Sequence, residues 1–281
     1  MVKKISVSKY LSYLFLIVVS AIWLIPLIFG FSTSFRSQTE IVSSGFRLLP
    51  VNWVVENYLA IFSDTSTAPI VKWIGNSLFI AITHTLLVVI VISITAYGYS
   101  RMKFKGRDVL FFTLLAISFF PNVVNLIPSY KIIDVLGWVN TPWAMIVPGL
   151  AAMGNIFLVR QFMKNIPREL DESARVDGAS DFQIYSRIIL PSIKPILIVC
   201  ALFSFIGSWN DFLWPVIVYT DVDKMPVTAG LLLLQDIYGN YRMMGQLVGS
   251  ALLAIIPTLL LFVFAQKYFV HSLNLNEGIK G

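Results

Sequence analysis

The sequence predicts an all-α integral membrane protein with about six transmembrane helices. Hydrophobic residues make up 57% of the 281 residues and charged residues only 13%, which leaves too few polar groups to cover a soluble domain. The apolar residues form long continuous runs, and a helix needs about 20 such residues to cross a bilayer. Transmembrane β-barrels show short segments of alternating polarity instead, so helices are the predicted class. We interpret residues 1–281 as one polytopic domain.

Six apolar runs are the predicted spans. They cover approximately residues 11–31, 74–97, 109–127, 142–161, 195–219 and 247–269. The first run follows three lysines, as a signal peptide does, but it is longer than the roughly 7 to 15 apolar residues at the core of a signal. We therefore interpret it as a retained span. In the external segment that follows, Trp53, Tyr58 and Phe62 predict a short amphipathic helix.

Basic residues predict the orientation of these spans. Six spans place both termini on one side of the membrane, and only six of the 21 Lys and Arg residues fall on the opposite side: Arg36, Arg47, Lys72, Lys131, Lys224 and Arg242. Because Lys and Arg accumulate on the cytoplasmic side, both termini are predicted to be cytoplasmic. The net charge of +6 follows from this bias and gives no reason to expect nucleic acid binding.

Residues 162–194 are a charged segment, predicted to be cytoplasmic, that is too long for a simple turn between spans. Pro167 predicts the start of a helix and Gly178 its end, so a helix is expected over residues 167–177. Within it, Asp171 and Arg175 are four residues apart, in the order that favours an ion pair. The spacing of Leu170, Ala174 and Gly178 aligns them on one helix face, where two very small residues would let another surface approach closely.

A second short helix is predicted after the glycine. Ser180 or Asp181 can cap its start, and Pro191 is expected to end it. An apolar side is provided by Ile184, Ile188 and Ile189. From the residues alone, the two helices could equally be a solvated loop whose charges only keep it soluble.

The spacing in this segment resembles the EAA loop of ABC importer permeases. The matching positions are Glu172, Ser173, Ala174, Gly178, Ile188, Leu190 and Pro191. Ser173 stands where the family usually has alanine. The stretches "FSTSFRS", "GNSLFIA", "SWNDFLWP" and "QKYFVHSLNLNEGIKG" extend the resemblance to maltose-type carbohydrate importer permeases almost end to end. Residues 273–277 depart from the small-residue ending that is usual in the family.

The resemblance implies a membrane assembly in a prokaryotic cell membrane. Its expected parts are this permease, a second homologous permease, two ATPase subunits and an extracytoplasmic solute-binding protein that delivers a carbohydrate, with an oligosaccharide as the expected class. The first helix of the loop would be the coupling helix that docks in a groove of an ATPase subunit. The residues to which this contact is carried over are Leu170, Glu172, Ser173, Ala174, Gly178, Ile188, Leu190 and Pro191.

The chain itself is not expected to bind or hydrolyse ATP. It contains no GxxxxGK[ST] phosphate loop, so we assign it no catalytic residue, no metal ligand and no bound cofactor. The partner ATPase subunits would use the ATP and Mg²⁺. ATP hydrolysis can change the conformation of the permease only if closure of the ATPase pair favours one permease conformation over the other. The charged loop is the expected contact between the permease and the ATPase.

Polar and aromatic side chains within apolar spans are the candidates for the substrate path, because sugars are bound by hydrogen bonds and by stacking on rings. The candidates are Asn122, Asn125, Asn155, Trp209, Asn210 and Asp211. The same side chains could instead join helices to one another or anchor them at the interface. Pro121 and Pro215 are expected to bend their helices and to free backbone groups.

Two other function classes stay open from the residues: a stand-alone secondary transporter or channel, and a scaffold that only recruits an ATPase. A symporter is expected to keep ionisable residues deep in its spans, and His84 is one such residue. Its simpler interpretation is a neutral side chain that is hydrogen bonded to a neighbouring helix. Gly245 and Gly249 form a GxxxG pattern at the start of the last span, which indicates close helix packing. The sequence does not specify which sugar is carried.

Overall fold

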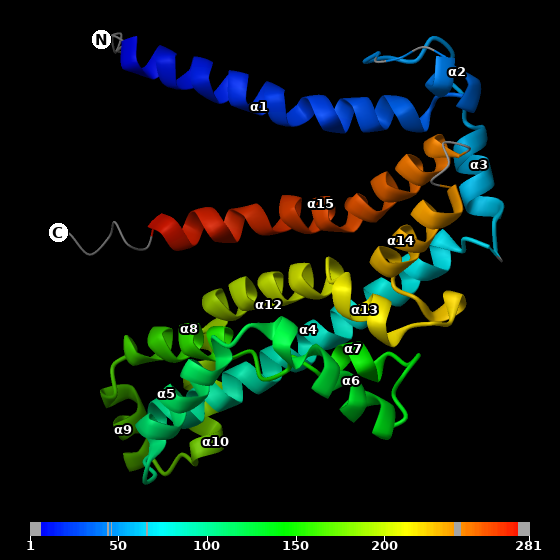
Figure 1. Ribbon diagram of the computed structural model, residues 1–281. Helices are drawn as coiled ribbons and strands as arrows, with labels where there is room; N and C mark the ends of the chain where they lie inside the picture. Colours follow the sequence, from blue (N-terminus) through cyan, green and yellow to red (C-terminus); the bar gives the residue numbers. More distant parts are fainter. Residues whose placement is uncertain (1–6, 44, 46, 66, 239–242, 275–281) are drawn as a thin grey trace. The chain divides into compact units, whose positions relative to one another are not determined.

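The computed structural model describes residues 7–43, 45, 47–65, 67–238 and 243–274, and within them every regular element is helical. The predicted all-α class is therefore confirmed (Figure 1). Three helices are long and apolar enough to cross a membrane, and two helix pairs that bend sharply at a short break bring the candidate spans to at most five among these residues. The chain divides into two compact units, which we describe separately.

The first unit comprises Met1–Val71 and Gly230–Ile256. It contains α1 (Val7–Ser34), α2 (Gln38–Ser43), α3 (Glu56–Ser63), most of α14 (Val227–Tyr238) and the first part of α15 (Met244–Asn274). From Lys9 to Ser34, α1 is apolar and nearly all of its surface is open, as expected for a helix that contacts lipid. The short helix α3 contains Tyr58 and Phe62 of the helix that the sequence predicts, whereas Trp53 precedes it.

Close packing in the first unit occurs where α15 crosses α3. A Cβ atom on Gly245 would overlap the amide group of Asn57, with Cγ only 2.8 Å away, and one on Gly249 would lie 3.0 Å from Cδ1 of Ile61. Gly245 therefore has no room for a side chain, and at Gly249 the end of the Ile61 side chain would have to move. The GxxxG pattern therefore marks a close helix contact, as its sequence indicates.

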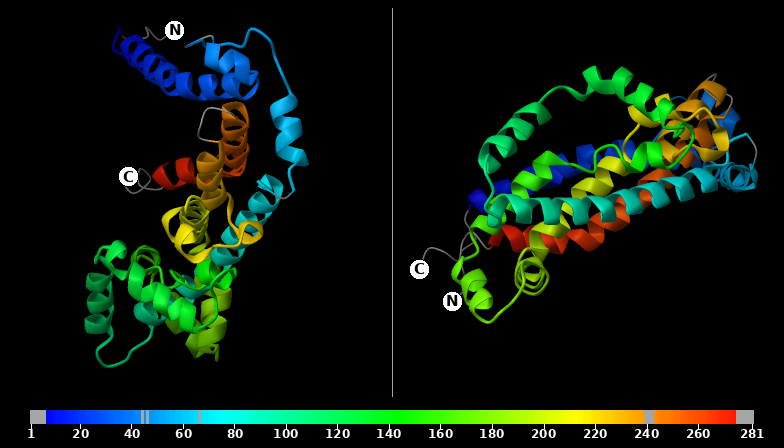
Figure 2. Two further views of the ribbon diagram at one scale, coloured as in Figure 1. Left: turned by 45° about the vertical axis from the view of Figure 1, so that its right-hand side comes forward. Right: turned by 90° about the horizontal axis from the view of Figure 1, so that it is seen from below.

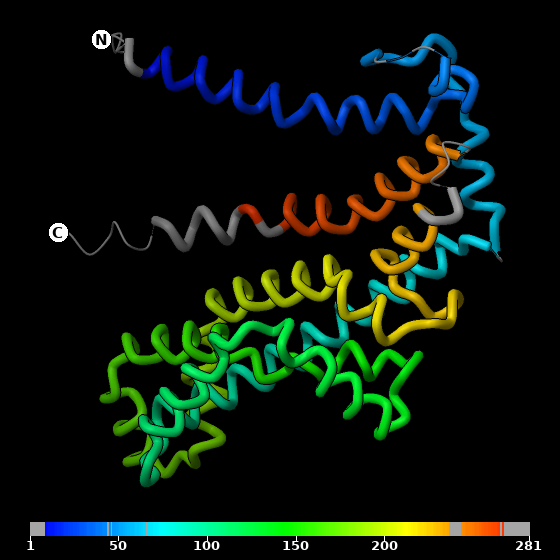
Figure 3. The backbone as a smooth tube through the Cα atoms, in the orientation of Figure 1, coloured from blue at the N-terminus to red at the C-terminus, as the bar shows by residue number. Residues whose placement is uncertain are grey.

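The second unit comprises Lys72–Ala229 and Pro257–Gly281. Most of α4 (Ile70–Arg101) belongs to it, and Figure 3 shows this helix as an unbroken tube. The other elements are α5 (Arg107–Ser118), η1 (Asn122–Asn125), α6 (Leu126–Val135), α7 (Trp143–Ile146), α8 (Met153–Lys164), α9 (Glu169–Val176), α10 (Asp181–Ile184), η2 (Tyr185–Ile189), α11 (Leu190–Ser192), α12 (Lys194–Trp209), α13 (Leu213–Val218) and η3 (Val222–Lys224).

Two apolar clusters hold the second unit together. The larger one packs the second half of α4 against α8 and against the run from α10 to α12, with Ile92, Met163 and Ile189 fully buried. The smaller one packs the first half of α4 against α6, α7 and the end of α13, around Ile80 and Ile146. Because α4 contributes residues to both clusters, it is the central helix around which this unit packs.

The runs 109–127, 142–161 and 195–219 are not the continuous helices that the sequence predicts. The first stops at Ser118 and resumes in η1 and α6 at a bend of 90°, which Figure 2 shows in the arch formed by α5 and α6. Pro121, at this break, lacks the N–H that a helix would need there. The second run is interrupted between α7 and α8, where Pro148 is followed by Gly149 with a positive φ of 87°, a conformation that glycine adopts readily.

The third run breaks between α12 and α13, at residues 210–212. The break leaves backbone groups without helical partners, and one of them is bonded by a side chain: Thr228 Oγ1 donates to the carbonyl oxygen of Asp211 at 2.5 Å. Pro215 lies in the first turn of α13, where its missing N–H costs no helical hydrogen bond. The break therefore precedes this proline instead of falling at it.

Candidate functional site

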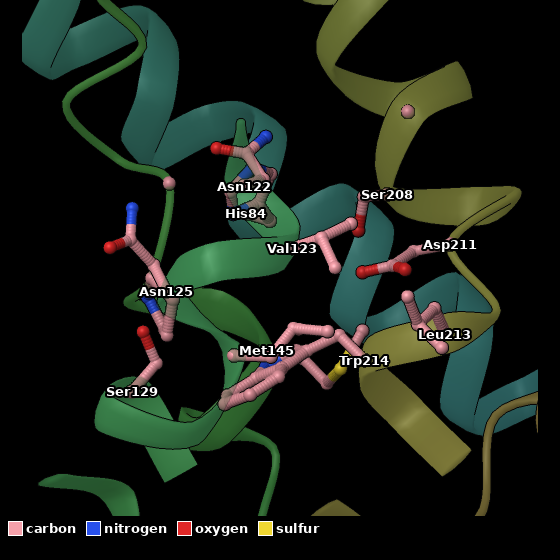
Figure 4. Close-up of a pocket in the computed structure, with 14 residues that line it drawn as sticks. His84, Asn122, Val123, Asn125, Ser129, Met145, Ser208, Asp211, Leu213 and Trp214 are labelled. Atoms are coloured by element: carbon pink, nitrogen blue, oxygen red, sulfur yellow. The ribbon is translucent and has the colours of Figure 1, made fainter. Parts of the chain in front are cut away.

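A pocket of about 510 Å³ lies in the second unit, where the three broken helices meet. Its lining includes residues beside each break, such as Asn122, Gly149 and Asp211. Figure 4 shows Asn125 and Ser129 on one side of it and Ser208 and Asp211 on the other. Irregular backbone at membrane depth is tolerated where it lines a cavity, so the breaks and the pocket have a common explanation.

Three of the six predicted path residues line this pocket. Asn122 and Asn125 reach it from η1, directly after the bend at Pro121. Asp211 reaches it from the break, two residues before the start of α13.

The other three predicted path residues lie outside the pocket lining. Asn155 Nδ2 is 3.3 Å from Ser204 Oγ and joins α8 to α12. The ring of Trp209 is buried and stacks on Phe205 at a centroid distance of 6.0 Å. Asn210 Nδ2 donates to the carbonyl oxygen of Ile206 at 3.0 Å. Only the Asn155 contact joins two helices, which is the alternative that the sequence left open, whereas Trp209 and Asn210 contact residues of the same helix, α12.

Several lining residues were not among the candidates, with Ser129, Ser208 and Trp214 as examples. Trp214 is held by its Nε1, which donates to the carbonyl oxygen of Ala144 at 2.8 Å. A signal for Ser208 was present, because it is a polar residue in an apolar run and directly precedes Trp209 and Asn210. Ser208 and Asp211 both line the pocket, Ser208 from the end of α12 and Asp211 from the break that follows it (Figure 4).

His84 both lines the pocket and bonds to a neighbouring helix. Its Nδ1 lies 2.9 Å from the carbonyl oxygen of Ile146, and because a carbonyl only accepts, Nδ1 carries the proton. This contact agrees with the simpler interpretation of the histidine. It also fixes α7 against the middle of α4.

The charged segment folds as a helix, a glycine turn and a second helix. In α9, the N–H of Gly178 donates to Arg175 and the N–H of Ala179 donates to Ala174, which is the Schellman pattern of helix ends. Gly178 has a φ of 82°, as this pattern requires. Ser180 then caps α10 through a full capping box with Gln183.

Two details of this segment differ from the sequence prediction. Asp171 and Arg175 do not pair with each other: Asp171 Oδ2 lies 3.1 Å from Nε of Arg101, and Arg175 pairs with Asp181 at 2.5 Å. Partners from other elements are closer because α9 packs with Asp171 facing inward. Pro191 does not end the second helix, since it lies inside α11 and the 75° bend follows Ser192.

The residues assigned to the coupling contact differ in accessibility. Leu170, Glu172, Ser173, Gly178 and Pro191 are exposed, whereas Ala174, Ile188 and Leu190 are half-buried against the larger apolar cluster. Ser173 Oγ donates back to the carbonyl oxygen of Leu170 at 3.1 Å. Sequence reasoning overlooked Val176 and Phe182, whose side chains are 88% and 75% exposed.

Two expectations concern the rest of the chain. In the part that the structure describes, no group of three or more His, Cys, Asp or Glu residues could hold a metal ion. The unusual ending at residues 273–277 and the position of both termini fall largely outside the described residues.

Several apolar helices of spanning length, together with a pocket at three helix breaks, define a multi-pass membrane protein of the transport class. The chain belongs to the family of binding-protein-dependent transport system inner membrane components, whose family model matches residues 89–274.

Curated relatives match nearly the whole chain. The arabinooligosaccharides transport system permease protein of Halalkalibacterium halodurans is 33% identical over 258 residues, which are 91% of each chain. The trehalose/maltose transport system permease protein of Thermococcus litoralis is 32% identical over 260 residues, or 92% of each chain. The maltodextrin transport system permease protein of Bacillus subtilis is 30% identical over 280 residues, which are 98% of this chain and 97% of the relative.

A solved structure shares the fold. A chain of a bacterial ABC transporter involved in the import of the acidic polysaccharide alginate superposes with a TM-score of 0.81 at 25% sequence identity. The match covers 94% of this chain and 99% of that chain.

Proposed function

We propose that this chain is a permease subunit of an ATP-driven importer and forms, with a homologous permease, the transmembrane path for a carbohydrate. The observation that carries the substrate class is the agreement among relatives. Three relatives that match more than nine-tenths of the chain are named for the transport of arabinooligosaccharides, trehalose or maltose, and maltodextrin. All of these are saccharides, so an oligosaccharide is the expected substrate.

The proposed topology has six crossings. They are α1, α4, the bent pair of α5 and α6, the interrupted pair of α7 and α8, α12 with α13, and α15. An even number of crossings puts both termini on one side, and the distribution of Lys and Arg identifies that side as the cytoplasm. The loop that contains α9 and α10 is then cytoplasmic.

The proposed substrate path includes the pocket between the broken helices. Its lining contains amide, hydroxyl and carboxylate groups together with the ring of Trp214. Sugars are bound by such hydrogen-bonding groups and by aromatic rings. The homologous permease would complete the wall of the path.

The proposed partners follow from the family and from the shape of the loop. The family is defined by its dependence on a binding protein, which would deliver the sugar from outside the cell. Two ATPase subunits would bind ATP and Mg²⁺, and one of them would receive the exposed side of α9, where Glu172 and Val176 lie four residues apart. Asp171 faces inward on the same helix, so α9 has one side for the chain and one side for a partner.

Transport in proteoliposomes tests this function. The purified complex of both permeases and the ATPase pair would be reconstituted with its solute-binding protein and labelled arabinotriose or maltotriose. We expect uptake only when ATP and Mg²⁺ are supplied on the ATPase side. Uptake by the permeases alone, or uptake driven by an ion gradient, would instead identify a secondary transporter. Intact assembly with no uptake of any saccharide would identify a scaffold.

A further inference from the structure

One face of α4 carries three polar residues that all bond to the segment containing α9 and α10. They are Ser93, Tyr97 and Arg101, spaced four residues apart, which places them in line along the helix. All three are nine-tenths or more buried, although they are polar. A buried polar group is tolerated when it is hydrogen bonded, so the bonds of these three residues explain their position.

Each of the three residues bonds to a different point of the segment. Ser93 Oγ lies 2.8 Å from the hydroxyl oxygen of Tyr185, and Tyr97 OH donates to the carbonyl oxygen of Asp181 at 3.3 Å. Arg101 Nη2 donates to the carbonyl oxygen of Ile166 at 2.9 Å. Arg101 Nε also lies 3.1 Å from Oδ2 of Asp171. The contacts therefore extend from the chain before α9 to the turn after α10.

The helices α9 and α10 are also joined to each other. Arg175 at the end of α9 pairs with Asp181 at the start of α10, with Nη2 and Oδ1 2.5 Å apart. The rings of Tyr97 and Tyr185 pack at a centroid distance of 5.2 Å. A force on the exposed side of α9 would therefore reach α4 through several contacts at once.

The same helix reaches the pocket. His84 lies on α4, lines the pocket and bonds to the carbonyl oxygen of Ile146. His84 and Arg101 are 17 positions apart on α4, which is about 26 Å at the rise of an α-helix. Because α4 is helical throughout this stretch, a tilt at its end would move the pocket wall.

Stability alone is a weak explanation for the ion pair between Arg101 and Asp171. The side chains of Arg101 and Asp171 are 4% and 11% exposed, and the cost of removing two charges from water often cancels their attraction. Apolar residues could fill the same space without that cost. The contact of Arg101 Nε with Asp171 is an ion pair without hydrogen-bond geometry, so the orientation of Arg101 is set by the bond that its Nη2 donates to the carbonyl oxygen of Ile166, just before α9.

We propose that Ser93, Tyr97 and Arg101 are positioning residues that couple the α9–α10 segment to α4, so that docking of a partner on α9 changes the shape of the pocket. This proposal rests on the proposed function, since it needs an ATPase as the partner. The element with two positions would be α4 together with the segment bound to it, and both the pocket and the docked partner would bias its equilibrium.

The test uses the complete reconstituted transporter with its solute-binding protein and labelled maltotriose or arabinotriose. The double variant Ser93→Ala/Tyr97→Phe removes two hydroxyl groups and leaves no charge unpaired. We expect the number of sugars transported per ATP hydrolysed to fall about threefold or more, because two hydrogen bonds between α4 and the segment are lost. The ATPase subunits should still copurify, and hydrolysis should continue.

Two further variants separate coupling from folding. Tyr99→Phe removes a hydroxyl from the same turns of α4 without touching the three bonds, and it should leave the ratio unchanged. Ser93→Thr keeps a hydroxyl at the first position, and in the background of Tyr97→Phe it should recover part of the ratio. An unchanged ratio in the double variant would overturn the proposal, and so would a loss that only follows reduced assembly. If the wild-type complex transports sugar without ATP, the proposed function fails first.

Discussion

Arg160 Nη2 lies 2.6 Å from Oδ1 of Asp108, and this contact ties the middle of α8 to the first turn of α5. The guanidinium of Arg160 also lies 4.1 Å from the centre of the Phe111 ring, and its Nε donates to the carbonyl oxygen of Tyr99 at 3.3 Å. The arginine side chain is only 2% exposed. One buried side chain thus joins α4, α5 and α8.

Arg160→Ala should destabilise the protein markedly. The change removes a half-exposed ion pair, a hydrogen bond, a cation–π contact and the packing of a buried side-chain stem, so we expect a loss of about 2–4 kcal/mol in the free energy of unfolding. Thermal unfolding in detergent measures it. The matched control is Lys72→Ala, which breaks the exposed pair with Asp223 and should cost no more than about 1 kcal/mol. Equal effects of the two changes would contradict the role of Arg160.

Gly245→Ala should loosen the contact between α15 and α3. The new Cβ would displace Asn57, whose Nδ2 donates to the carbonyl oxygens of Ser34 and Arg36 at 2.9 Å each. Loss of these bonds and the added strain should cost about 1–3 kcal/mol. The control Gly75→Ala places a Cβ in open space within α4 and should be neutral or slightly stabilising. The midpoints of thermal unfolding of the two variants measure the difference. Equal midpoints would contradict the predicted close contact at Gly245.

Gly178→Asn should be tolerated better than Gly178→Leu. Both residues add a side chain where the chain itself has open space, but asparagine accepts the positive φ at this position with much less strain than leucine. Leucine would also place bulk where a partner is expected to dock. We expect both variants to insert in the membrane, with sugar uptake per ATP retained for asparagine and lost for leucine. Normal coupling of the leucine variant would remove Gly178 from the docking contact.

Asn125→Ala should lower uptake, whereas Asn210→Ala should not. Asn125 lines the pocket, and each lost hydrogen bond to a sugar is worth about 1 kcal/mol, or a factor of about five in affinity. Asn210 bonds back to Ile206 and lies outside the lining. Initial rates of labelled sugar uptake, normalised to assembled complex, measure the difference. If Asn210→Ala is the more harmful change, the path does not run through this pocket.

Local features of the fold could be predicted from the sequence because they depend on nearby residues. Gly178 ends α9 since only the residue itself must adopt a positive φ, and Ser180 caps α10 through Gln183, three residues away. The long apolar runs that became α1, α4 and α15 are equally local signals.

Features that depend on distant residues were not predictable in the same way. Asp171 pairs with Arg101, which is 70 positions away in the sequence, and not with Arg175 on its own helix. For a similar reason, only some of the residues predicted for the substrate path line the pocket. Asn122 and Asp211 follow helix breaks that turn them toward the pocket, whereas Asn155 lies on an unbroken part of α8 and bonds to Ser204 on α12. Hydropathy indicates that a run is apolar but not where its helix breaks.

The most direct test of the account is the number of sugar molecules imported per ATP hydrolysed by the reconstituted transporter carrying Glu172→Lys. Glu172 lies on the exposed side of α9, so a reversed charge there should disturb docking while the protein folds and inserts normally. The account predicts that ATP-dependent uptake is largely lost, and that Asp134→Lys, which reverses the charge of an exposed acid on α6 outside the charged segment, retains it. Uptake at the wild-type ratio in the Glu172→Lys transporter would contradict the claim that α9 couples this permease to an ATPase.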